Sequence, residues 1–247
     1  MPLVSISIAS IYTRNGAPVP LPARMARCAP DLHGALLALD AEVARRGGAL
    51  RLSDLFRSAE MQDRAHADWK SGRKRAFSPP AGQSLHEAGR AFDLDLAALR
   101  MPLPEFWRLA ALHGVVPIIG TPCPTSLEAW HFERPGSHAM VRDYCATPDG
   151  AVRGVSARRV MAESALLALG LRVPRLGGRQ REGFVQTALI RLGAGPGLVD
   201  GLIGRRTRAA LATLGLEWGD TADTVRGLEH LLRARFPEEE GGSLPPP

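Results

Sequence analysis

Aromatic residues and cysteines are scarce in this chain, and long apolar runs are missing. Aromatics make up 5% of the 247 residues, and the only cysteines are Cys28, Cys123 and Cys145. Three cysteines cannot all pair within one chain, and no C-x-x-C spacing predicts a structural zinc site, so we expect free thiols. No apolar run reaches the roughly 18 residues that cross a bilayer. The sequence therefore predicts no stable membrane insertion.

Residues 1–10 are apolar but carry neither a basic start nor a clear cleavage site, so we predict no signal peptide. The net charge is +6, and one basic run covers Lys70–Arg75. This run is either a solvated loop or an electropositive rim that attracts an acidic polymer. Because aromatics are few and no binding-module signature accompanies the run, we do not expect nucleic acid as a partner.

One short string looks at first like the helical zinc signature H-E-x-x-H. His86 and Glu87 fill its start, but residue 90 is Arg, so the second histidine is absent. Glu87 is therefore not a candidate base. The sequence instead predicts a turn at Gly89, followed by a strand.

Residues 91–96 alternate between apolar and carboxylate side chains. Phe92 and Leu94 would face a core, and Asp93 and Asp95 would point to the opposite face. The predicted strand thus directs carboxylates toward a site near His86. Either aspartate is a candidate for that site.

A second string, Glu128-Ala129-Trp130-His131, adds another imidazole and another carboxylate. In a regular strand Glu128 and His131 would point to opposite faces, because they are three residues apart. For both to reach one site, the chain must turn or bulge between them, or a strand must begin only near Trp130. Two imidazoles with an aspartate are a ligand set for catalytic zinc, which keeps one position open for water.

The pattern S-x-H-x-x-G-x-A-x-D at residues 84–93, followed by E-x-W-H at 128–131, resembles the zinc D-Ala-D-Ala peptidase family. That family includes D,D-carboxypeptidases and L-alanyl-D-glutamate endolysins, and the resemblance spans about residues 30–135. It implies an α+β fold like that of the hedgehog signalling domain, with a small antiparallel sheet and helices on one side. It also implies Zn²⁺ held by His86, Asp93 and His131, with Glu128 as general base.

The resemblance extends upstream, where alternation over 50–56 predicts a short strand that enters a helix. Arg57 and Gln62 match the family, which implies that Arg57 binds the carbonyl oxygen under attack and that Gln62 contacts substrate. An exposed ion pair is the alternative for Arg57. Ser84 is implied as a substrate contact or, alternatively, caps a turn. Asp95 remains the rival ligand to Asp93.

Glu133 follows the second string, and it or Asp95 is a candidate to orient a ligating imidazole.

The chain changes character near residue 150. Apolar spacing predicts helices over 155–169, 182–192 and 221–236. A string that begins in the second of these segments resembles the three-helix peptidoglycan-binding module. The matching residues are Gln186, Leu192, Gly193, Asp200, Gly201, Gly204, Thr207 and Ala210. Residues 214–216 lack the usual aromatic, and a plain helical bundle without a ligand is the alternative.

We thus expect three segments: a zinc peptidase domain at 1–150, a helical domain at 151–237 and a disordered acidic and Gly/Pro-rich tail at 238–247. The functional hypothesis is a zinc metallopeptidase that hydrolyses peptide bonds in peptidoglycan stem peptides. It would act in the periplasm or cell wall, reached by another export route or by lysis. A non-catalytic zinc-containing wall-binding protein is the alternative. The bond cleaved and the oligomeric state stay open.

Overall fold

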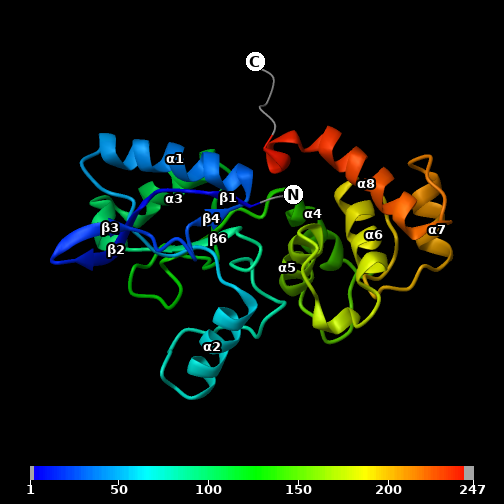
Figure 1. Ribbon diagram of the computed structural model, residues 1–247, viewed down its shortest axis with the longest axis horizontal. Coiled ribbons are helices and arrows are strands. Elements are labelled where there is room, and N and C mark those ends of the chain that lie inside the picture. Colours follow the sequence, from blue (N-terminus) through cyan, green and yellow to red (C-terminus); the bar gives the residue numbers. More distant parts are fainter. Residues whose placement is uncertain (1–2, 242–247) are drawn as a thin grey trace. The chain divides into compact units, whose positions relative to one another are not determined.

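The computed structural model describes residues 3–241, and these form two compact units (Figure 1). The sheet unit comprises residues 3–81 and 85–135, and the helical unit comprises 82–84 and 136–241. The division falls after Pro135, earlier than the expected boundary at 150, because helix α4 (Ala139–Cys145) packs against helices of the second unit. The two units are described separately.

The sheet unit is built from short strands and three α-helices. Its strands are β1 (Val4–Ser5), β2 (Ala9–Arg14), β3 (Ala17–Pro20), β4 (Arg27–Cys28), β5 (Leu52–Asp54), β6 (Ala91–Leu94), β7 (Val116–Pro117) and β8 (His131–Glu133). Its helices are α1 (Pro30–Arg45), α2 (Ala59–Lys70), the 3₁₀ turn η1 (Leu96–Leu99) and α3 (Leu103–Leu112).

Six strands form one sheet in the order β3-β2-β5-β6-β8-β7, and β1 pairs with β4 separately. All neighbouring pairs in the large sheet are antiparallel except β2 and β5, which run parallel. The α+β class is as expected, but the prediction of a purely antiparallel sheet is wrong at this pair. The chain reaches β5 from β3 through the helix α1, and a crossover of that length permits parallel pairing.

Helices α1 and α3 lie together against the sheet, and their apolar sides share one core with it (Figure 1). Leu36 and Leu39 from α1 and Phe106 from α3 are fully buried there. From the sheet, Phe92 and Phe132 enter the same core, with their rings stacked at 5.8 Å between centroids. The apolar face of β6 is thereby fixed inward, which leaves the side chain of Asp93 on the opposite face.

Helix α2 differs from the other two because Gln62 is its only buried residue. Figure 1 shows it standing apart from α1 and α3. Ser58 caps its first turn by accepting a hydrogen bond from the Met61 amide at 3.3 Å. Apart from Met61, which is partly buried against the core, polar contacts rather than an apolar face hold α2 in place.

The helical unit contains the three helices that the apolar spacing predicts, as α5 (Ala157–Ala168), α6 (Gln180–Arg191) and α8 (Thr221–Arg235). It also contains α4, α7 (Arg205–Ala212) and the 3₁₀ turns η2 (Gly136–His138), η3 (Pro174–Leu176) and η4 (Pro237–Glu240). The Gln186 side chain accepts hydrogen bonds from the Asp200 and Gly201 amides at 3.0 and 2.7 Å. Gly201 has φ +75°, a left-handed conformation that favours glycine.

The expected disordered tail needs correction at its start. Residues 237–240 form η4, and Glu239 is 1% exposed because it binds Ser137 and Arg191. Residues 242–247 of that predicted tail lie outside the described part. Within the described chain, no helix is long and apolar enough to cross a membrane.

Candidate metal centre

A loop and two adjacent strands bring the predicted ligands together. Gly89 turns the chain between His86 and β6 with φ +61°, and a Cβ there would come within 3.0 Å of the Cys28 Cα. The turn therefore requires glycine. Asp93 on β6 is paired directly with His131 on β8 in the antiparallel register. Both side chains point to the face opposite the core.

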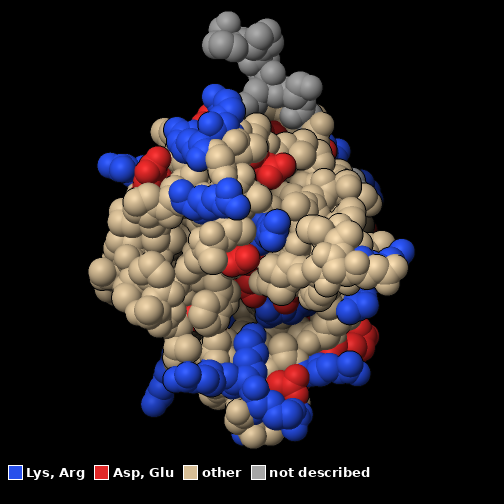
Figure 2. All heavy atoms as spheres, turned by 90° about the vertical axis from the view of Figure 1, so that its left-hand side faces the viewer, with Lys and Arg blue, Asp and Glu red and all other residues tan. Residues whose placement is uncertain are grey.

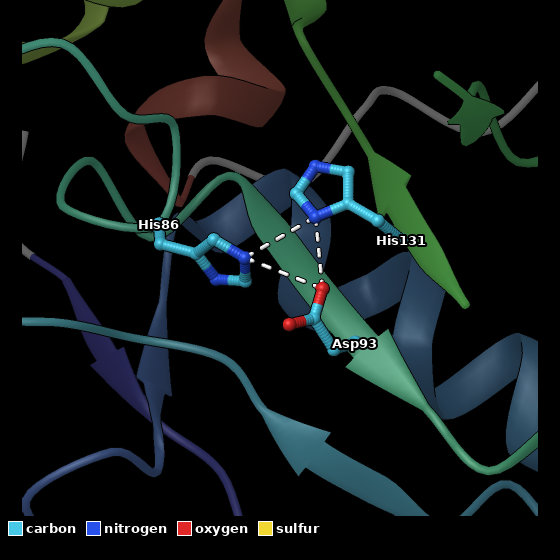
Figure 3. A group of neighbouring side chains, drawn as sticks. All are labelled: His86, Asp93 and His131. Carbon is cyan, nitrogen blue, oxygen red and sulfur yellow. Dashed lines mark hydrogen bonds and ion pairs between the residues drawn. The ribbon is translucent and has the colours of Figure 1, made fainter. Parts of the chain in front are cut away.

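Three potential ligand atoms converge in this place (Figure 3). The His131 Nδ1 lies 2.8 Å from the Asp93 Oδ1 and 3.3 Å from the His86 Nε2. The remaining separation, from His86 Nε2 to Asp93 Oδ1, is 3.4 Å. All three residues are buried, at 2%, 8% and 8% exposure for His86, Asp93 and His131.

Hydrogen bonds on the far side of each imidazole fix which nitrogen faces the cluster. The His86 Nδ1 lies 2.7 Å from the Leu55 carbonyl oxygen, which can only accept, so Nδ1 carries the proton. The His131 Nε2 faces the Glu133 carboxylate at 3.2 Å, so the same reasoning protonates Nε2. Two imidazole lone pairs and a carboxylate oxygen then point at one another, an arrangement that needs a cation between them.

The ionisation of the metal-free cluster follows from this arrangement. Burial disfavours the charge on Asp93, but the neighbouring His86 and His131 outweigh it and hold the pKa of Asp93 well below its usual range. Burial likewise lowers the pKa of His131, yet hydrogen bonds to Asp93 and Glu133 raise it overall to about 9. Without a metal, a proton on His131 Nδ1 thus takes the place of the missing cation.

Glu133 therefore lies where a carboxylate orients a ligating histidine. The rival ligand Asp95 has a different role. It follows the last residue of β6 and caps η1, where its Oδ1 accepts a hydrogen bond from the Ala97 amide at 3.0 Å. The strand stops at Leu94, so Asp95 no longer shares the alternation that made it a candidate.

Glu128 resolves the geometric difficulty in the way the sequence predicts. It lies in a turn before β8 with φ +67°, and its carbonyl accepts a hydrogen bond from the His131 amide at 3.0 Å. The strand begins only at His131. Among the described residues, the Glu128 Oε1 is buried without a hydrogen-bond partner. A left-handed non-glycine residue with an unpaired carboxylate oxygen is strained and incompletely solvated, which is typical of a reacting group.

Arg57 is buried rather than exposed, so its alternative as a surface ion pair does not apply. Its guanidinium donates to the Asp54 Oδ2 at 2.6 Å and to the Asp93 Oδ2 at 3.2 Å. Its third contact is the Gln62 Oε1 at 3.3 Å. Arg57 therefore binds the carboxylate oxygen of Asp93 that faces away from the imidazoles.

Gln62 differs from its expected contact with substrate. It is fully buried, and its amide nitrogen donates to the Ser78 Oγ at 3.1 Å and to the Pro79 carbonyl at 2.6 Å. Its oxygen is taken by Arg57. Gln62 thus positions Arg57 and holds the loop after α2. Ser84 is buried and belongs to the helical unit, and its roles as substrate contact or turn cap both stay predictions.

One site residue was not singled out from the sequence. Lys74 lies in the basic run, but it is only partly exposed, and its ammonium lies close enough to Asp93, Glu128, Asp54 and Arg57 for their charges to act on it. The only sequence signal was the basic run itself, which did not separate Lys74 from its neighbours.

The donor atoms of the cluster also indicate which ion it suits. A set of two imidazoles and one carboxylate suits Zn²⁺, which takes nitrogen and oxygen ligands in tetrahedral geometry. The residues present therefore fit a zinc ion.

The predicted free thiols are confirmed at Cys28, Cys123 and Cys145. Hydrogen bonds from Thr125 and Ser126 lower the pKa of Cys123 to about 7, and burial raises the pKa of Cys28 to about 12 and of Cys145 to about 11.

Comparison with known proteins adds little to this geometry. No protein-family model matches the chain, and no curated protein does. Among solved structures, the LdcB LD-carboxypeptidase, whose structure is described as revealing the molecular basis of peptidoglycan recognition, aligns with a TM-score of 0.36 and 19% identity. The alignment covers 66% of this chain and 96% of that chain. A likeness of that degree establishes neither a family nor an activity for this chain.

Proposed function

We propose that this protein is a zinc-dependent peptidase that hydrolyses a peptide bond in peptidoglycan stem peptides. The observation that carries the proposal is the convergence of His86, Asp93 and His131 beside the unpaired carboxylate of Glu128. The ligand set leaves a zinc ion an open position, which is typical of catalytic rather than structural sites. The substrate class rests on the motif resemblance at residues 84–93 and 128–131.

The residues divide the chemistry among them. His86, Asp93 and His131 would hold the ion, which when bound acts as a Lewis acid and makes a water molecule more acidic. Glu128 takes a proton from the attacking water and returns it to the leaving amine. Since its Oε1 has no partner among the described residues, it is available to accept that proton.

Arg57 acts mainly through Asp93 in this proposal. Its guanidinium already binds two carboxylates, so much of its positive charge is balanced before any substrate arrives. It keeps Asp93 ionised and orients the ligand oxygen. Stabilisation of the developing oxyanion by the remaining guanidinium hydrogens is the second part of its proposed role.

The test is the substitution Glu128→Gln, which keeps the shape of the side chain and removes the base. We expect unchanged zinc content and a fall in the cleavage of purified sacculi of about 10²- to 10⁴-fold, the usual contribution of a general base. Released muropeptides are identified by mass spectrometry, which also shows the bond that is cut. The matched control is Glu60→Gln, an exposed glutamate in the first turn of α2.

Cleavage by Glu128→Gln at the rate of the unaltered protein would refute the assignment of the base. If the zinc-loaded unaltered protein released no peptide from sacculi or from soluble muropeptides, the peptidase proposal itself would be wrong. The non-catalytic wall-binding alternative would then predict co-sedimentation with sacculi without cleavage.

A further inference from the structure

The two cationic side chains of the candidate site, Arg57 and Lys74, differ in how many partners they have within the chain. Arg57 donates to Asp54, Asp93 and Gln62, so its guanidinium is bound on all three nitrogens. Lys74 is the second cation near the cluster. Among the described residues, no carboxylate lies within ion-pair distance of its ammonium.

The backbone around Lys74 is held in place by contacts with α2. The Lys74 amide donates to the Asp68 carbonyl at 3.0 Å, and Arg73 binds the Asp68 carboxylate with two nitrogens at 2.8 and 2.6 Å. Further along, Ser78 is 1% exposed and binds Gln62. The loop that carries Lys74 is thus linked through Gln62 to Arg57.

The position of Lys74 also differs from that of the other basic residues in its run. Lys70, Arg73 and Arg75 are exposed, whereas Lys74 is partly buried. In Figure 2, Lys and Arg side chains gather over α2 and the loop that follows it, and Asp and Glu side chains lie in a hollow above them. A partly buried ammonium without an ionic partner is less stable than a paired one, so a negative group that arrives beside it is attracted strongly.

We propose that Lys74 binds a carboxylate of the substrate next to the scissile amide, which makes the enzyme selective for stem peptides whose carboxylate at that place is free. This inference rests on the proposed function, since it names the substrate group that the same site recognises. Arg57 cannot take this role as readily, because two protein carboxylates already occupy it. Two peptides carry such a group: a C-terminal D-Ala-D-Ala, and an L-Ala-γ-D-Glu unit with its α-carboxylate.

The experiment compares free acids with amides. The probes are acetyl-L-Lys-D-Ala-D-Ala and its C-terminal amide, and L-Ala-γ-D-Glu-L-Lys with the D-Glu α-carboxylate free or amidated. For whichever bond is cut, we expect the zinc-loaded protein to prefer the free acid by about tenfold or more in kcat/KM, the usual worth of a charge-assisted contact. In Lys74→Met the free acid should lose this advantage, so that the ratio of the kcat/KM values for acid and amide falls to about one.

Two further variants serve as controls. Lys74→Arg keeps the charge and should retain most of the preference. Lys70→Met makes the same change at an exposed position in the last turn of α2 and should behave as the unaltered protein. Zinc content and circular dichroism show whether each variant is folded and loaded.

A preference for the free acid that survives in Lys74→Met would overturn the proposal, as would an equal loss with acid and amide, since Lys74 would then act on the reaction centre. Binding of the same probes to zinc-loaded Glu128→Gln, measured by calorimetry, decides the matter without turnover. If the unaltered protein cleaves nothing, the peptidase proposal fails. The carboxylate site then stands or falls on whether Lys74→Met, added to Glu128→Gln, weakens binding of the acid alone.

Discussion

Both units bury carboxylates, but they compensate them differently. In the helical unit, Glu163 is fully buried and binds Arg159 and Arg175, and Glu239 binds Arg191 at 2.8 Å. Each of these glutamates has an arginine partner supplied by the chain. In the sheet unit, by contrast, Asp93 binds Arg57 with one oxygen and faces the His131 imidazole with the other, and the Glu133 carboxylate faces the second nitrogen of that imidazole.

This difference distinguishes a structural ion pair from a site that binds a ligand. A buried charge that is fully paired within the chain needs nothing else to be stable. A cluster in which two imidazole lone pairs and a carboxylate oxygen converge gains stability only when a proton or a metal ion enters it. The comparison leads to four predictions, given from the largest expected effect to the smallest.

The largest effect is expected from removing a ligand. Asp93→Asn takes away the charge of a ligand and one of the two carboxylate partners of Arg57, so we expect loss of tightly bound zinc and no detectable peptide release. Elemental analysis after dialysis against dilute zinc measures the first, and muropeptide release the second. Asp95→Asn is the control: it lies two positions along the chain but caps η1, so it should keep one zinc per chain. Full zinc occupancy in Asp93→Asn would contradict the ligand assignment.

The second prediction concerns the helical unit. Glu163→Ala leaves Arg159 and Arg175 without their shared carboxylate, and breaking a buried pair in this way costs about 3 kcal/mol of unfolding free energy. We take the lower end of the usual range because both arginines retain some contact with solvent. Urea titration followed by circular dichroism measures the loss, with Glu229→Ala on the exposed side of α8 as control. Zinc content should not change, and a loss of zinc would show that the two clusters are coupled.

Several parts of this contrast could be predicted from the sequence. Alternation over 91–94 correctly placed Asp93 opposite Phe92, and the three-residue spacing of Glu128 and His131 required the turn that the structure shows. These features depend on local geometry. The ion pairs of Glu163 with Arg175 and of Glu239 with Arg191, by contrast, join residues 12 and 48 positions apart, and no local pattern marks these partners.

The features that the sequence did not reveal have the same origin. The burial of Gln62 could not be predicted, because its partners Ser78 and Pro79 come from a loop whose path no periodicity describes. The parallel pairing of β2 with β5 likewise depends on where α1 returns the chain to the sheet. For the tail, composition predicted disorder from residue 238, whereas specific partners, among them Ser137 and Arg191, hold Glu239.

The third prediction uses the proton that occupies the metal-free cluster. The pKa of His131 is raised from 6.5 to about 9, so its proton stabilises the folded metal-free protein fully below about pH 6.5, and this contribution is lost as the pH rises through 9. The lowered pKa of Asp93 acts in the opposite sense: its contribution is present above its usual value and is lost only as the pH falls below that. Zinc must displace the His131 proton.

We therefore expect about one proton to be released for each zinc bound at pH 7, and progressively fewer as the pH rises above 9. Calorimetry in buffers of different ionisation enthalpy measures this number directly. Glu133→Gln removes one of the two carboxylates that raise the pKa of His131, so its proton release should decline at a lower pH. Zinc binding at pH 7 without proton release would show that His131 is already neutral and that the cluster does not hold a proton.

The smallest effects are expected at the helix caps, where the two units also differ. Asp220 caps α8 by accepting hydrogen bonds from the Ala222 and Asp223 amides, and Asp220→Ala should cost about 1 kcal/mol of stability. Ser58→Ala removes a similar cap from α2, but α2 buries only Gln62, so its first turn has little else to hold it beside Arg57. Both substitutions should therefore lower stability by a similar amount. Peptide release should become slower in Ser58→Ala and stay unchanged in Asp220→Ala. Equal activity in the two variants would mean that α2 is held by Gln62 and its loop alone, and that the cap contributes only to folding.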